Sequence, residues 1–279
     1  MTAVTSGTFT GAMKTVAFSL LVLATAASAA KIPSTWKTCV INQAHTNVCL
    51  KKSVQTALDE LTVKGSPSLG VFPLDPMRIS KLRLQSGSGS IALDLTFLDL
   101  DIYGFKNLRI DELDQKPARL AARSPEVTCF RPDFANNRLR LNVTITSDLV
   151  LNGNYVVKGR LLVVPINGAG RCNITLGKPV AANAEISLTK RKGADGRIYP
   201  HVEKFQFDFN PKTFKLYFHD KNHGDNQLGV TLNRIANDNS NEILRDLKPA
   251  ISVAFGQAFE DIANRIFSKV PFNEVFPSK

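Results

Sequence analysis

The chain has 279 residues, of which 43% are hydrophobic and 21% charged, and it contains 14 prolines and 17 glycines. This composition is that of a globular protein and excludes a disordered, collagen-like or proline-rich chain. The formal net charge of +11 permits an anionic partner without naming one. The length allows one large domain or two small ones.

The N-terminal segment has the pattern of a secretory signal peptide. Met13-Lys14 precedes an apolar run from Val16 to Ala24, and Ala27-Ser28-Ala29 supplies the small residues of a cleavage site. The apolar run is too short to span a bilayer core of about 30 Å as a stable helix. We therefore predict a signal peptide over residues 1–29, one mature domain over residues 30–279, and a soluble, secreted, extracellular product.

Secretion changes how the cysteines are interpreted, because disulfides persist outside the cell. The cysteines of the mature chain are Cys39, Cys49, Cys129 and Cys172. Three pairings are possible, and no C-x₂₋₄-C pair points to zinc. The closeness of Cys39 to Cys49 favours that bridge, which leaves Cys129 to pair with Cys172. Asn142 and Asn173 each begin a glycosylation sequon, which matters only in a secreted chain.

The first predicted element of the mature chain is a helix that begins near Thr46. Its apolar residues recur at helical spacing, at Leu50, Val54, Ala57, Leu58 and Leu61. Gly65 follows as a C-terminal stop. Prolines then indicate an extended stretch over residues 67–76.

From about residue 77 to 220 the apolar period is two, which predicts long antiparallel strands with one dry and one wet face. Alternation is clearest over residues 91–97, 139–145, 155–163, 205–209 and 214–218. After Phe97 the apolar phase slips by one, which indicates a β-bulge and hence a curved sheet. Residues 87–90 and 193–196 are glycine-containing and predict hairpin turns.

The C-terminal third is predicted to be helical. Apolar residues recur at steps of three and four from Leu228 to Ile266, with Asp225 as the N-cap and a wider step across Asn239. The run would be about 65–70 Å long at 1.5 Å per residue, and Pro249 is expected to kink it. A helix of this length does not fit inside a compact domain of this size. The expected fold class is therefore α+β, elongated, with a highly curved antiparallel sheet wrapped around one long C-terminal helix.

Several chemistries are not supported by the sequence. There is no G-x-S-x-G nucleophile motif. His219 and His223 have the spacing of a zinc motif, but the residues between and after them favour a loop, so no metal site is expected. The basic run Lys190-Arg191-Lys192 is short and sits at an expected hairpin tip, which argues against a nucleic-acid partner. We expect no enzyme activity and no cofactor.

The order of several motifs resembles the insect haemolymph juvenile hormone binding protein and takeout family. These motifs are Ser68–Ile79, Gly153–Ile166, Gly168–Ile174, Leu247–Ala250 and Ile266–Phe272, together with the N-terminal cysteine pair. The resemblance runs over essentially the whole mature chain, and none of the motifs is catalytic. It implies an internal hydrophobic tunnel and carriage of juvenile hormone or a related terpenoid or lipid.

Tyr155 is the strongest candidate for a polar ligand contact, because it shares the dry face of its strand and a buried hydroxyl needs a partner. The alternative is a core tyrosine bonded to backbone. The full set of candidate ligand-binding residues is Tyr155, Val157, Leu161, Val163, Phe72, Leu95, Ile174, Phe205, Phe207, Phe218, Ile251, Phe255 and Phe259. The competing functions are a takeout-like carrier of fatty acids or other lipids, and a basic module that makes transient contact with a membrane or receptor.

Overall fold

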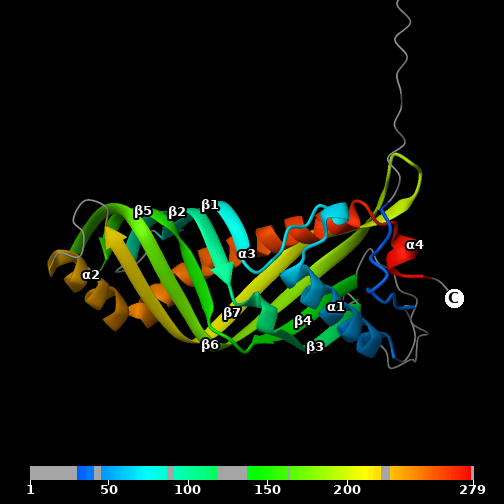
Figure 1. Ribbon diagram of the computed structural model, residues 1–279, viewed down its shortest axis with the longest axis horizontal. Coiled ribbons are helices and arrows are strands. Elements are labelled where there is room, and N and C mark those ends of the chain that lie inside the picture. Colours follow the sequence, from blue (N-terminus) through cyan, green and yellow to red (C-terminus); the bar gives the residue numbers. More distant parts are fainter. Residues whose placement is uncertain are drawn as a thin grey trace, which may run out of the picture.

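The computed structural model describes residues 30–40, 45–86, 91–117, 137–161, 164–220 and 227–277. A strongly curved antiparallel sheet wraps a long C-terminal helix, and the molecule is elongated, which confirms the predicted fold class (Figure 1). The helices are α1 (Thr46–Val63), α2 (Gln227–Asp238), α3 (Ser240–Phe267) and α4 (Phe272–Val275), with short 3₁₀ turns at Pro67–Leu69 and Phe105–Asn107. The strands are β1 (Met77–Ser86), β2 (Ile91–Tyr103), β3 (Leu108–Pro117), β4 (Asn137–Ile145), β5 (Leu149–Leu161), β6 (Val164–Lys192) and β7 (Ile198–Asp220).

Strand β6 is the centre of the sheet. Its first part pairs with β5, its second part pairs with β4 on the same side, and β7 pairs along its other side. Strands β1 and β2 extend the sheet beyond β5, and β3 extends it beyond β4. The sheet thus has two wings, β1-β2-β5 and β3-β4, joined by the long β6–β7 ribbon (Figure 1).

The phase slip in the sequence corresponds to a bulge in β2. The register with β5 shifts between Leu98 and Asp101, and Asp99 adopts a positive φ of 49°. The bulge gives β2 one more residue than β5 at this point. The next buried residues after Phe97 are therefore Leu100 and Ile102, which still face the core.

The C-terminal helix is broken at a different place from the predicted one. The chain forms two helices that meet at Asn239, whereas Pro249 lies inside α3. The Asn239 side chain donates to the carbonyl of Ile235 and so competes with helix continuation. Pro249 is tolerated because it and Arg245, whose carbonyl loses its helical donor, both face solvent. Asp225, the expected cap, lies outside the described residues.

Side-chain amides on the helices cover the free edge of β7. Asn237 accepts a hydrogen bond from the Leu216 N–H and donates one to the Leu216 carbonyl, at 3.0 and 2.6 Å. Asn233 makes the same pair of bonds with Phe218, and Asn264 makes it with Val202. Each amide therefore replaces a neighbouring strand, which satisfies the edge and holds α2 and α3 along it.

The edge of β3 is covered in the same way by α1. The Gln55 carbonyl accepts from the Ile110 N–H at 2.7 Å, and its amide donates to the Leu108 carbonyl at 3.0 Å. The helix begins at Thr46 as predicted, and Gly65 follows it with a φ of 66°. A side chain at Gly65 would collide with the backbone of the following loop, which explains why glycine stands there.

Candidate functional site

One cavity of about 370 Å³ lies in the half of the molecule that contains the β3-β4 wing. It is enclosed by α1, β4, the second half of β6, the first half of β7 and the C-terminal half of α3. The residues around it are Ile32, Trp36, Lys37, Thr38, Cys39, Leu50, Ser53, Val54, Ala57, Leu58, Leu61, Thr62, Leu74, Met77, Ile102, Phe105, Leu108, Leu139, Leu141, Val143, Ile145, Leu149, Leu151, Leu176, Val180, Ala182, Asn183, Ala184, Ile186, Leu188, Val202, Phe205, Phe207, Phe209, Phe255, Phe259, Ile262, Ala263, Ile266, Phe267, Val270, Val275 and Phe276.

The strands contribute alternate residues to the cavity wall, as expected of strands with one dry face. Strand β4 supplies four aliphatic residues from Leu139 to Ile145, and β6 supplies Ala182, Ala184 and Ile186. The cavity wall is therefore almost wholly hydrocarbon, and it can hold a ligand by burial of apolar surface.

Phenylalanines from β7 and α3 form one side of the cavity. The ring of Phe207 lies 5.1 Å from that of Phe259 and 6.2 Å from that of Phe255, and Phe205 lies 5.6 Å from Phe259. Gly256 allows this packing, because a Cβ there would collide with the carbonyl of Phe205. The close approach of α3 to β7 thus holds the aromatic wall in place.

The few polar groups at the cavity are mostly bonded to the protein itself. The Trp36 indole N–H donates to the Glu60 carboxylate at 2.9 Å, and the Thr62 hydroxyl donates to the Asp59 carbonyl. The hydroxyl of Thr35 also donates to Glu60, and this hydrogen bond is the main reason that the pKa of Glu60 lies below its ordinary value. These groups fix the wall and leave the cavity interior apolar.

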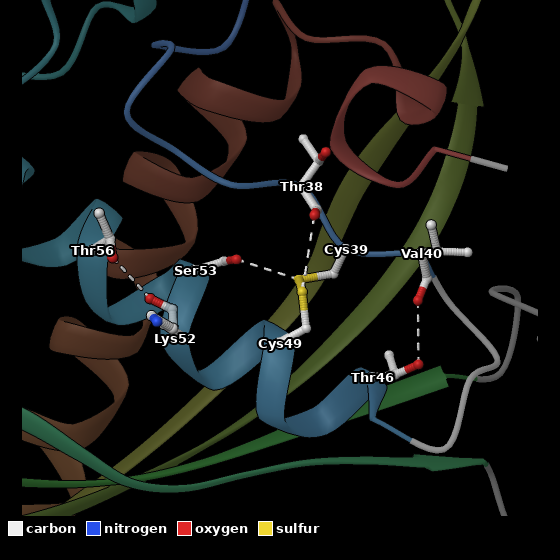
Figure 2. The surroundings of a disulfide bond; sticks show 8 residues. All are labelled: Thr38, Cys39, Val40, Thr46, Cys49, Lys52, Ser53 and Thr56. Carbon is white, nitrogen blue, oxygen red and sulfur yellow. Dashed lines mark hydrogen bonds between the residues drawn. A yellow bond between two sulfur atoms is a disulfide. The ribbon is translucent and has the colours of Figure 1, made fainter. Parts of the chain in front are cut away.

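The predicted bridge between Cys39 and Cys49 is present beside the cavity. The disulfide joins the N-terminal segment to the first turn of α1, and Figure 2 shows Ser53 beside it, with its hydroxyl 3.3 Å from the Cys39 sulfur. Cys39 is only 2% exposed and lies at the cavity wall with Thr38. The segment before α1 is thereby held over the cavity.

The second predicted bridge is not seen. Cys172 is a free, buried thiol, and Cys129 lies outside the described residues, so that pairing stays a prediction. Burial raises the pKa of the Cys172 thiol to about 11, while a backbone hydrogen bond with Gly153 acts in the opposite direction.

The predicted ligand-binding residues divide between the two halves of the molecule. Phe205, Phe207, Phe255 and Phe259 lie at the cavity. In the other half, Leu95, Tyr155, Val157, Leu161 and Ile174 are buried in the core, with Phe218 and Ile251 packed against it. None of these seven lines the cavity, because their inward faces pack directly on one another and on the helices.

Phe72 and Tyr155 differ from the other predicted ligand-binding residues in their surroundings. Phe72 is 78% exposed, which differs from its expected place at the ligand, because the tight loop after Gly65 turns it outward. The Tyr155 ring packs edge-on against Phe218, with centroids 4.8 Å apart, as in a core tyrosine. Val163 lies outside the described residues.

Sequence reasoning missed the contributions of α1, β4 and the alanines of β6. The alternation of β4 was visible in the sequence, and so was the run Ala181–Ala184, whose small side chains fill less space than neighbouring positions need. The sequence did not show which of the two wings, whose apolar faces are similar, would border the cavity.

No group of acidic residues, histidines and cysteines that could hold a metal occurs in the described part of the chain. His223 lies outside it. Among the described helices, none is long and apolar enough to cross a membrane. Asn173 of the second sequon is exposed, and Asn142 of the first is half-buried.

Known proteins share this fold. The haemolymph juvenile hormone binding protein family matches residues 18–277. The circadian clock-controlled protein daywake of Drosophila yakuba is 23% identical over 250 residues, which cover 88% of this chain and 89% of the relative. A proposed beta-carotene-binding protein of Schistocerca gregaria is 22% identical over 237 residues, 82% of this chain and 83% of the relative. The crystal structure of Epiphyas postvittana Takeout 1 matches with a TM-score of 0.65 and 20% identity over 86% of this chain and 99% of that one.

A strongly curved sheet and a long helix enclose the apolar cavity, and the Takeout 1 structure has the same fold. The chain belongs to the haemolymph juvenile hormone binding protein family, which confirms the resemblance noted in the sequence.

Proposed function

We propose that this protein is a secreted carrier that holds a neutral hydrophobic small molecule, juvenile hormone or a related terpenoid or lipid, in the cavity under α1. The observation that carries the proposal is the almost wholly hydrocarbon wall of that cavity. Each 100 Å² of apolar ligand surface buried there would contribute about 2.5 kcal/mol. Membership of a family of hydrophobic-ligand carriers supports the class of ligand.

The charge at the cavity favours a neutral ligand. Lys37 is the one cationic side chain among the described residues that line it, and no carboxylate lines it. A buried ion needs an opposite charge beside it. An ester, epoxide, alcohol or hydrocarbon needs none, so most of the cavity suits such a molecule.

The direct test is to identify the bound molecule. Protein secreted from insect cells is analysed by native mass spectrometry and then extracted with organic solvent, and we expect a terpenoid or lipid in the extract. Empty, folded protein that also fails to bind a juvenile hormone analogue would contradict the proposal.

A matched pair of variants tests the location of the ligand. Ala182 lines the cavity, whereas Ala181 is exposed on the opposite face of the same strand. Ala182→Phe should fill the cavity and weaken binding at least tenfold, because the added ring takes the ligand's volume. Ala181→Phe should leave binding unchanged. Equal affinities in the two variants would place the ligand elsewhere.

The alternative is a takeout-like carrier of fatty acids, and Lys37 favours it as the partner for a carboxylate. Lys37→Gln separates the two readings. It should weaken binding of a fatty acid several-fold, since an ion pair is lost, and leave a neutral terpenoid ester unaffected.

A basic docking module is the remaining candidate, from a different class. It would bind anionic lipid vesicles through the exposed lysines and arginines, and salt would abolish that binding. Vesicle binding with no bound small molecule in the extract would favour it over the carrier.

A further inference from the structure

A second hollow, of about 650 Å³, opens on the outer face of β6 and β7 beside the junction of α2 and α3. Its size is in the range of clefts that hold small molecules, roughly 300–1,000 Å³. It is lined by hydroxyl, amide and ammonium groups as well as by ring carbons, and polar residues make up a larger share of its lining than of the lining of the cavity under α1. It therefore suits a polar ligand with many hydroxyls.

The second sequon forms the floor of this groove. Asn173 and Thr175 both line it, while Ile174 between them is buried in the core. The Asn173 amide donates to the Asn152 side-chain oxygen at 2.6 Å, and its own oxygen lies 3.5 Å from the Thr175 hydroxyl, which donates to it. An amide nitrogen carries two hydrogens, so replacing one of them leaves the bond to Asn152 intact.

A tyrosine stands directly across from the acceptor. Tyr217 of β7 is the register partner of Asn173, and its side chain is 50% exposed at the groove. Side chains directly opposite on antiparallel strands have Cβ atoms about 4.5–5.5 Å apart and lie on the same face. The first sugar attached to Asn173 would thus lie beside the ring, against which the C–H face of a pyranose can pack.

The far wall of the groove is polar. Ser240 and Asn241 stand at the start of α3, where the helical run is interrupted at Asn239. Their hydroxyl and amide groups can exchange hydrogen bonds with sugar hydroxyls. Aromatic packing on one side and polar partners on the other is the arrangement that a short oligosaccharide requires.

We propose that Asn173 carries an N-linked oligosaccharide whose first sugars occupy this groove and pack on Tyr217. In the transfer, the amide nitrogen forms a bond to C1 of a sugar carried on a lipid pyrophosphate. The bond from C1 to the pyrophosphate oxygen breaks, the pyrophosphate leaves with the electron pair, and the nitrogen loses one proton. The proposal depends on secretion and not on the identity of the ligand under α1.

The first experiment asks whether the sugar is present. The full chain is secreted from an insect cell line and its peptides are mapped by mass spectrometry. We expect a glycan on the Asn173 peptide, and we expect Thr175→Ala to abolish it. Asn142→Gln, at the half-buried sequon, should not affect it. An unmodified Asn173 in secreted wild-type protein would overturn the proposal.

The second experiment asks whether the sugar occupies the groove. Thermal midpoints are compared before and after enzymatic release of the glycan, which converts the Asn173 side chain to a carboxylate in every variant alike. We expect release to lower the midpoint by about 2–4 °C in the wild type. Tyr217→Phe should keep this difference, Tyr217→Ser should lose it, and Tyr103→Ser, at an exposed tyrosine on β2, should keep it.

An unchanged difference in Tyr217→Ser would show a glycan that does not pack on the ring, and would overturn the second half of the proposal. If Tyr217→Ser is not secreted, hydrogen exchange of wild-type protein decides the same question. Residues 212–218 should exchange more slowly with the glycan than without it, and equal rates would refute the docking.

Discussion

Two alanines of β6 line the cavity opposite phenylalanines of β7. Ala182 is the register partner of Phe209, and Ala184 is the register partner of Phe207. A methyl group opposite a ring fills much less volume than a second large side chain would, and the Phe207 ring is held by its contacts with Phe255 and Phe259 of α3. The space follows from local side-chain choice on two strands and not from a gap in the backbone.

Tyr155 gives the first prediction at the scale of single residues. Because its ring packs against Phe218 in the half of the molecule away from the cavity, its hydroxyl cannot reach a ligand under α1. Tyr155→Phe should therefore leave the dissociation constant of the bound ligand unchanged within a factor of two. A fluorescence titration measures this, and a tenfold weakening would return Tyr155 to the binding site.

Cys172 gives the second prediction at the scale of single residues. Its folded thiol keeps its proton up to about pH 11, whereas an unfolded thiol ionises near pH 9. The unfolded state therefore binds fewer protons between these values, and the free energy of unfolding should fall as pH rises through this range. Urea denaturation at pH 8 and pH 10 should show a smaller loss for Cys172→Ala than for the wild type. Identical losses would mean that Cys172 does not titrate as a free thiol.

The position of Cys172 also bears on the second bridge. It lies fifteen positions along β6 from Ser187, a path of about 50 Å at 3.3 Å per residue. Cys129 precedes Asn137, which begins β4 at that end, by eight residues, which span at most about 29 Å. A thiol reagent applied to unreduced, denatured protein tests the predicted pairing: an unlabelled Cys172 would support the bridge to Cys129, and a labelled Cys172 would contradict it.

At the scale of elements, the helices act as substitutes for missing strands. Sheet edges present unpaired N–H and C=O groups that favour aggregation. Here the amides of Asn233, Asn237 and Asn264 satisfy those of β7, and Gln55 satisfies those of β3. Each edge residue of a strand presents one N–H donor and one C=O acceptor. A carboxamide has one acceptor oxygen and one donor nitrogen, so a single side chain can bond to both.

This arrangement gives the third prediction. Asn237→Leu removes both bonds to Leu216 and leaves its N–H and C=O partly buried without those partners. The free energy of unfolding should fall by about 2–4 kcal/mol, since two backbone groups lose their hydrogen bonds. Chemical denaturation measures it, with Asn273→Leu on the exposed face of α4 as the control. A loss no larger than that of the control would show that the edge does not depend on the amide.

The elements show how far sequence reasoning reaches. Period-two alternation predicted the strands, and the phase slip after Phe97 predicted the bulge, because both depend on which face of one strand is dry. A kink was predicted at Pro249, whereas the helical run is interrupted at Asn239, because the exposure of Pro249 depends on packing against β7. The half of the molecule that contains the cavity was not predictable either. Both wings have apolar inner faces, and only the volume that the side chains fill inside each wing distinguishes them.

At the scale of the whole molecule, elongation follows from the length of shared elements. Strand β6 has 29 residues and contacts both wings, and the 28 residues of α3 extend about 42 Å. A compact chain of about 250 residues would have a radius of gyration near 18 Å. Small-angle X-ray scattering of the mature protein should give a clearly larger value and an elongated distance distribution. A value of 18 Å or less would contradict the elongated shape in Figure 1.

The two ends of the described chain meet at the same place. Ile32 and Trp36, near the N-terminal end of the described chain, line the cavity, and so do Val275 and Phe276 near its C-terminal end. This convergence has a practical consequence for anyone who produces the protein. Three residues would separate a purification tag appended after Lys279 from Phe276, and two would separate a tag placed before Ala30 from Ile32. Affinity measurements should therefore use tag-free protein, or carry the tag in the β6–β7 turn at Gly193–Gly196, where the chain already faces water.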